Sequence, residues 1–222
     1  MTEGKDAYKY KKIYERRGVL SKPGIEGDFS HWEKTGKSSK WLRYGHSFEG
    51  KVNFNEVVAL NPDSIIDIGC GWNEFCKEAS KRLSIPTFGV DIACPGANYI
   101  APAHSMPKIG DKEYDLLVSF DCIEHIPEEE VEGAFSEFSR VSKRVFLKIC
   151  LENSHTKIDG EGLHVCLKSK EWWEEISRKY FDNPIVSLRG SAKFSEEKGT
   201  LIRSFPGEEP RHLIVIGKCK TR

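Results

Sequence analysis

The stretch FDCIEHIP, residues 120–127, brings two carboxylates and an imidazole within five positions. Asp121, Glu124 and His125 are spaced i, i+3 and i+4, so a helical turn would place all three on one face. Such a set can hold a divalent ion such as Mg²⁺, Mn²⁺ or Zn²⁺. His164 is a candidate fourth ligand, and His155 is the alternative. The competing interpretation is that the Glu–His pair only packs against or hydrogen-bonds the turn.

The same side chains could also move a proton. An oxygen or nitrogen atom that gains a substituent must lose a proton, and His125, His164 or Asp121 could accept it. Histidine suits this role because its pKa lies near neutrality, and a bound metal could instead lower the pKa of the reacting group. Each histidine also has a structural interpretation, since a single histidine more often has a structural than a catalytic role.

A second group lies in SIIDIGCGWNEF, residues 64–75, where an apolar strand runs into a glycine turn and a helix. This order places a ligand at the carboxyl end of the strand. A dinucleotide motif counted from Gly69 would need a glycine at position 74, where Glu74 would repel a pyrophosphate. Asp67 and Glu74 instead suit a cation. Asp91, 20 residues after Gly71, can accept hydrogen bonds from both hydroxyls of a ribose.

These residues fit S-adenosylmethionine (SAM), which has a ribose and two positive groups but no phosphate. A dinucleotide, and a turn that merely closes a strand–helix unit, are the alternatives.

Alternating strands and helices would position both groups. Apolar runs predict strands at 64–69, 87–92, 114–120, 144–150, 184–190 and 212–218. Helical spacing predicts helices at 74–83, 128–143 and 168–181, the last with Trp172, Ile176 and Tyr180 on one stripe. This order predicts a parallel α/β sheet covered by helices on both faces. The last two strands are expected to pair as an antiparallel hairpin, joined by a long loop or flap at 191–211.

DIGCG, GVDI and EYDLLVSFDCIEHI follow one another in a way that resembles the class I SAM-dependent methyltransferases. The resemblance covers residues 60–182 and the final strand. It implies an α/β fold with a Rossmann-like, seven-stranded sheet, mostly parallel with an antiparallel last strand, and SAM as the cofactor. By this resemblance, SAM and its methyl group lie among Asp67, Gly69, Cys70 and Gly71 (methionine part), Asp91 (ribose), Ile92, Ala103 and His104 (adenine side), and Phe120 and Asp121 (methyl group or acceptor).

Two positions depart from the family pattern. Asn73 stands where a third glycine is usual, and asparagine is the best non-glycine residue for a left-handed backbone. Pro102 stands where an aspartate often binds the adenine amino group, so adenine recognition is expected to rest on backbone atoms or on His104. The DCIEH cluster also resembles the E-x-x-E-H metal site of some O-methyltransferases, including ubiquinone-pathway and small-RNA 3′-end enzymes, with Asp121 in place of the first glutamate.

Residues 1–59 form an aromatic and basic arm, and residues 60–222 form the SAM-binding domain. Short helices and loops are expected in the arm, without an independent domain. In the resembling family such an arm folds over SAM as a cap. Arg43 could then pair with the SAM carboxylate, and Tyr44 or His46 could line the pocket. The alternative is that these side chains cap the sheet edge as part of the core.

The net charge of the 222 residues is zero, so nothing global points to nucleic acid or an anionic membrane. KYKKIYERR, at 9–17, is interrupted by Glu15 and is interpreted as a solvated helix. No apolar run is long enough for a membrane span, and the N-terminus has no apolar signal-peptide core. Seven cysteines without a CxxC pair indicate reduced thiols in a cytoplasmic protein.

The sequence therefore predicts a cytoplasmic enzyme that moves a methyl group from SAM to an O or N atom of a small-molecule acceptor, as a monomer or homodimer. The first alternative is a metal-assisted RNA or nucleotide methyltransferase. The second is a SAM-binding protein without turnover, which Asn73 and Pro102 motivate.

Overall fold

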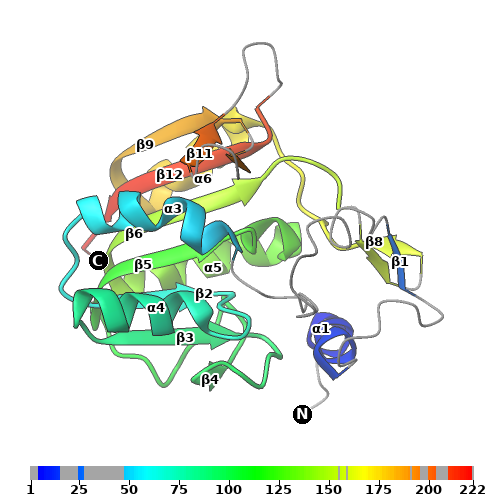
Figure 1. Ribbon diagram of the computed structural model, residues 1–222, viewed down its shortest axis with the longest axis horizontal. Helices are drawn as coiled ribbons and strands as arrows, with labels where there is room; N and C mark the ends of the chain where they lie inside the picture. The colour runs from blue at the N-terminus through cyan, green and yellow to red at the C-terminus, as the bar shows by residue number, and fades with distance from the viewer. Residues whose placement is uncertain are drawn as a thin grey trace.

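The computed structural model describes residues 5–15, 25–27, 48–154, 156–158, 160–190, 192–195, 200–203 and 210–221. Its central sheet consists of β2 (Ile65–Ile68), β3 (Thr87–Asp91), β4 (Tyr99–Ile100), β5 (Tyr114–Phe120), β6 (Ser142–Cys150), β9 (Phe181–Arg189) and β12 (His212–Cys219). The seven strands are ordered β4-β3-β2-β5-β6-β12-β9 (Figure 1). β2 to β6 pair in parallel, and β12 runs antiparallel to both β6 and β9. The Rossmann-like sheet with an antiparallel last strand is thus confirmed.

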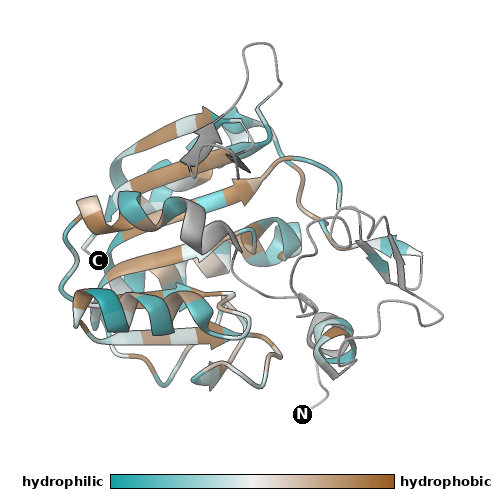
Figure 2. Ribbon diagram, viewed as in Figure 1, coloured by the Kyte–Doolittle hydropathy of each residue, from teal (hydrophilic) through white to brown (hydrophobic). Residues whose placement is uncertain are grey.

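The strands are apolar because helices cover both faces of the sheet. Every residue of β2 and β5 is buried, as expected for central parallel strands. Figure 2 shows β5, β6 and β12 mostly in brown, while the visible face of α4 (Glu74–Leu83) is mostly teal. Lys148 is the exception in β6, since it is a buried cation within an apolar run.

Within the described residues, four helices cover the sheet. They are α3 (Phe48–Ala59) and α4 on one face, and α5 (Glu128–Val141) and α6 (Lys170–Tyr180) on the other. Phe54 of α3 packs in one core cluster with Ile65, and Phe135 of α5 packs in the second with Ile66. Successive residues of β2 therefore serve opposite faces, as the alternation of a strand requires. Phe54 lies within the predicted arm, and the boundary at residue 59 stays a prediction.

The buried face of α6 contains the predicted stripe and one further residue. Trp173 is fully buried and stacks on Phe135, with ring centroids 6.2 Å apart. Trp172 is only partly buried and lies edge-on against Trp173. Trp172, Ile176 and Tyr180 all pack in or against the same core cluster, as predicted, and Trp173 is a further, fully buried residue that the predicted stripe left out. Spacing alone did not identify Trp173, because either of the two adjacent tryptophans has helical spacing to Ile176.

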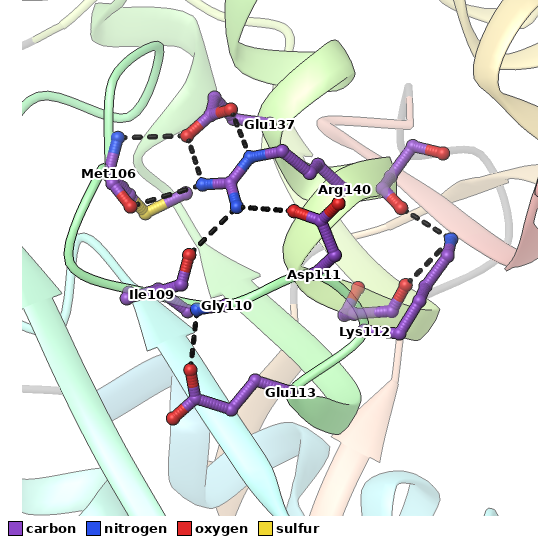
Figure 3. Close-up of polar contacts among 10 residues, drawn as sticks. Met106, Ile109, Gly110, Asp111, Lys112, Glu113, Glu137 and Arg140 are labelled. Atoms are coloured by element: carbon purple, nitrogen blue, oxygen red, sulfur yellow. Dashed lines mark hydrogen bonds and ion pairs between the residues drawn. The ribbon is translucent and has the colours of Figure 1, made fainter. Parts of the chain in front are cut away.

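Two cations attach the loop before β5 to the end of α5 (Figure 3). Arg140 binds carbonyl or carboxylate oxygens of Met106, Ile109, Asp111 and Glu137. Lys112 donates to the carbonyl oxygens of Ser139, Ser142 and Lys220 at 2.5, 3.2 and 2.9 Å. These contacts lie at the amino end of β5, so they fix the strand without occupying its carboxyl end.

Helix α1 (Lys5–Glu15) and a small sheet lie beyond the carboxyl ends of the parallel strands (Figure 1). The small sheet pairs β1 (Ile25–Gly27), β7 (Thr156–Ile158) and β8 (Glu161–Gly162) and was not predicted. β10 (Ala192–Ser195) and β11 (Thr200–Arg203) form a hairpin within the segment predicted as a loop or flap. That segment is therefore partly regular.

No helix in the described ranges is long and apolar enough to cross a membrane. All seven cysteines are free thiols, and five of them are buried. Burial raises the pKa of Cys166 to about 11, which keeps that thiol neutral near pH 7. The thiols of the core thus behave as small apolar side chains.

Candidate functional site

The turn after β2 has a left-handed backbone at three positions. Gly69 has a φ of +76°, Gly71 has a φ of +52°, and Asn73 has a φ of 62° immediately before α4. The backbone N–H groups of Gly69 and Cys70 donate to the Val90 carbonyl at 2.8 and 3.0 Å, which fixes the turn against β3. Asn73 therefore maintains the turn in place of the usual glycine, as the sequence predicts.

The Asn73 amide is buried against β3. Its Nδ2 donates to Asn98 Oδ1 at 2.7 Å, and the same oxygen accepts the Gly89 N–H at 2.8 Å. A Cβ built on Gly89 would lie 2.2 Å from Asn73 Oδ1, which is closer than atoms can pack. A side chain at position 73 is thus compatible with this fold only because position 89 has none.

Asp91 ends β3 and binds the glycine turn. Its Oδ1 accepts the Ala93 and Cys94 N–H groups at 2.9 and 2.8 Å. Its Oδ2 accepts the Gly71 N–H at 3.1 Å and the Tyr14 hydroxyl at 3.2 Å. Asp91 is 5% exposed, and its role as the ribose ligand stays a prediction.

A second buried carboxyl, Asp67, lies near Asp91. Burial, and then the charge of Asp91, raise the pKa of Asp67 well above its ordinary value. A cation bound beside the pair would favour the ionised form and lower that pKa again. Cys70, in the turn between them, is buried, and its thiol pKa is raised by burial. This local electrostatics suits the positive groups of SAM and disfavours a pyrophosphate.

The predicted adenine side lies after β3. Ile92 is half-buried, and Ala103 packs against the core cluster that contains α5. His104 Nδ1 lies 3.0 Å from Glu130 Oε2 at the start of α5. The structure therefore gives His104 a protein partner on α5, and its role toward adenine stays a prediction.

Phe120 and Asp121, at the end of β5, have different surroundings. Phe120 packs in the core, with its ring centroid 5.0 Å from that of Phe75. Asp121 has a φ of 48° and precedes the 3-10 turn η1 (Ile123–His125). Its two oxygens bind Lys148 Nζ at 3.0 and 2.9 Å, and His212 Nε2 lies 3.6 Å away. The expected common face with Glu124 and His125 does not include Asp121, because the helical turn begins only at residue 123.

Glu124, His125 and His164 come together in the structure. One donor atom of each lies within 4.8 Å of the others, and they are the only such group of three found among the described residues. Glu124 is completely buried, and neither carboxylate oxygen has a hydrogen-bond partner in the described part of the chain. Burial, and then Asp121, raise the pKa of Glu124 well above its ordinary value. His164 Nε2 lies 3.8 Å from Glu124 Oε1.

Backbone carbonyls orient both histidines. His125 Nδ1 lies 3.0 Å from the Leu163 carbonyl, and His164 Nδ1 lies 2.5 Å from the Glu152 carbonyl. Because a carbonyl can only accept, each Nδ1 carries the proton and Nε2 is the basic nitrogen. Burial, and then His164, lower the pKa of His125 to about 3, so this ring is neutral at pH 7.

Some predicted residues lie outside the described ranges, and others were missed. Arg43, Tyr44, His46 and His155 lie outside the described residues. Tyr10 and Tyr14 were missed, although their i, i+4 spacing in the arm indicates one helix face. Lys148 was missed as well, and the signal was a lysine inside the apolar run RVFLKIC.

The comparisons with known proteins agree with this geometry. Residues 39–202 match the methyltransferase domain family. A SAM-dependent methyltransferase of Archaeoglobus fulgidus has a TM-score of 0.55 at 17% identity, over 86% of this chain and 99% of that one. The methyltransferase domain of bacterial CtHen1 has a TM-score of 0.52 at 14% identity, over 76% and 97%. A Pyrococcus horikoshii protein has a TM-score of 0.52 at 13% identity, over 80% and 94%. A search of the curated proteins finds no match.

At these identities the solved structures show a shared fold, while the family match covers most of the chain. The left-handed glycine turn, the buried acid at the end of β3 and the sheet order are consistent with this family match. The chain belongs to the methyltransferase domain family and is a class I SAM-dependent methyltransferase.

Proposed function

We propose that the enzyme transfers the SAM methyl group to an O or N atom of a small-molecule acceptor at the carboxyl ends of β5 and β6. The observation that supports this most is the position of the Glu124–His125–His164 cluster, just after β5, the strand beside β2 and its glycine turn. Methyl transfer is an in-line displacement, so a site that holds donor and acceptor together supplies much of the rate.

The acceptor must also lose a proton. The pKa of His125, about 3, makes this ring a weak base that suits a neutral ligand or hydrogen-bond acceptor. His164 and Asp121 are better placed to take the proton. Asp121 is partly exposed, and Lys148 keeps it oriented at the strand end.

The same cluster supports a metal-assisted variant of this reaction. A fully buried carboxylate without a hydrogen-bond partner is costly, and a cation would satisfy both of its oxygens. Two imidazoles with one carboxylate suit Zn²⁺ or Mn²⁺ better than Mg²⁺, which prefers oxygen ligands. The carbonyl contacts at each Nδ1 are those of metal-binding histidines. Glu124, His125 and His164 would hold the ion, which would lower the pKa of an acceptor hydroxyl.

The metal proposal predicts one Zn²⁺ or Mn²⁺ per chain, measured by calorimetry and by metal analysis after dialysis. Glu124→Ala should abolish this binding, because it removes the central ligand. Asp121→Asn is the matched control and should retain it, since Asp121 pairs with Lys148 instead. No binding to the unmodified chain, or an equal loss in both variants, would contradict the proposal.

The function itself is tested by S-adenosylhomocysteine formation from SAM with phenols, catechols, amines and short RNAs. We expect turnover with a phenol, catechol or amine, and little dependence on salt. Turnover with RNA alone, with binding that weakens steeply with salt, would favour the RNA alternative. Loss of turnover with EDTA would assign the metal-assisted variant. No product with any acceptor would contradict the proposed function.

A further inference from the structure

Helix α1 contacts both halves of the site through one face. Tyr14 donates its hydroxyl to Asp91 Oδ2 at 3.2 Å, and the Tyr10 hydroxyl lies 2.8 Å from His125 Nδ1. The two tyrosines are four residues apart, so they project from the same side of the helix. Ile13, between them, packs on Leu163 in a small buried cluster. α1 is therefore seated on the site by specific contacts.

The number of hydrogen bonds that Asp91 can accept shows whether a ligand must replace the Tyr14 hydroxyl. A carboxylate has about four acceptor positions, and the described part of the chain supplies four donors. Three of the donors are backbone N–H groups of the turn and of the residues after β3, which the fold fixes in place. The Tyr14 hydroxyl is the one donor that can leave without breaking the turn.

We propose that Tyr14 occupies the acceptor position that a SAM ribose hydroxyl takes, so that α1 must move off Asp91 before SAM is fully bound. The proposal rests on Asp91 as the ribose ligand. It makes Tyr14 a competitor of the cofactor. A closed form that must open lowers the apparent affinity for SAM by the fraction of molecules that are open.

The second tyrosine links this movement to the acceptor side. Because Tyr10 and Tyr14 share a face, a shift of α1 that withdraws Tyr14 also draws Tyr10 away from His125. SAM binding would then uncover the histidine beside the acceptor position. The geometry therefore favours an order in which SAM binds before the acceptor.

The test is calorimetry of S-adenosylhomocysteine with Tyr14→Phe, which removes the hydroxyl and keeps the ring against Trp72. We expect binding roughly 5-fold tighter than in the unmodified enzyme, from the usual strength of one hydrogen bond. Tyr180→Phe is the matched control, because it removes a hydroxyl that donates to Glu132 at 3.2 Å, away from the site. That variant should bind like the unmodified enzyme.

Three further measurements distinguish the proposal from its premise that Asp91 binds the ribose. Asp91→Asn alone tests the ribose assignment, and unchanged affinity there would refute the premise. If that variant loses affinity, adding Tyr14→Phe to it should have no further effect, because Tyr14 has lost its acceptor. Amide hydrogen exchange in α1 should accelerate when S-adenosylhomocysteine binds. Unchanged or weaker binding by Tyr14→Phe alone, or slower exchange in α1, would overturn the proposal.

Discussion

Asp91→Asn should weaken S-adenosylhomocysteine binding by about 100-fold, from the loss of a hydrogen bond to a charged group. The amide has one acceptor oxygen instead of two, so it cannot serve the Ala93 and Cys94 N–H groups and a ribose hydroxyl together. Its NH₂ would also face the Gly71 N–H and disturb the turn. Isothermal calorimetry measures the change directly.

The control for this experiment is Asp111→Asn. Asp111 is 79% exposed and pairs with Arg140 at the opposite end of the sheet, so its loss should leave ligand affinity unchanged. Thermal unfolding of both variants shows whether the fold is intact. An Asp91→Asn protein that is folded and binds S-adenosylhomocysteine normally would mean that the ribose lies elsewhere.

Gly89→Ala should reduce the free energy of unfolding by about 3 kcal/mol, the upper range for overpacking in a core. The added methyl group would lie 2.2 Å from Asn73 Oδ1 and 2.7 Å from Cys70 Sγ. It would therefore force the glycine turn away from β3. Urea unfolding measures the stability, and weaker S-adenosylhomocysteine binding should accompany the loss.

Asn73→Gly should partly restore the stability that Gly89→Ala removes. It removes the amide that the new methyl group strikes and restores the residue usual at this position in the family. In the Gly89→Ala background it should recover part of the stability, since the contact with Cys70 Sγ remains. A double-mutant cycle gives the coupling. Strictly additive effects of the two substitutions would show that residues 73 and 89 do not constrain each other.

The sequence predicted best what depends on neighbouring residues. Helix α4 and strand β5 have the bounds that their apolar spacing gave. The left-handed Asn73 was also predictable, because the preference belongs to asparagine itself. The pairing of Asp121 with Lys148 was not, since the residues are 27 positions apart and meet only because β5 and β6 are adjacent.

The candidate metal group also shows that the sequence predicts local spacing better than contacts between distant residues. Local spacing identified Glu124 and His125, and the next loop suggested His164. Asp121 was included because i, i+3 spacing assumes a helix, and the chain instead turns at a φ of 48° before the helical turn starts. The contacts of α1 were beyond reach, because Tyr14 and Asp91 are 77 residues apart and no repeating pattern connects them.

The order of the strands has a consequence for folding during synthesis. β12 is the last of the described strands in chain order, yet it lies between β6 and β9. Until residues 212–219 leave the ribosome, β9 lacks its described neighbour in the sheet, and the edge of β6 that β12 later covers is unpaired. The hydrogen bond from Lys112 to the Lys220 carbonyl also cannot form before residue 220 is synthesised. The seven strands can therefore pair completely only after this region has been translated. The insertion of β12 between β6 and β9 is the late, non-local step of folding.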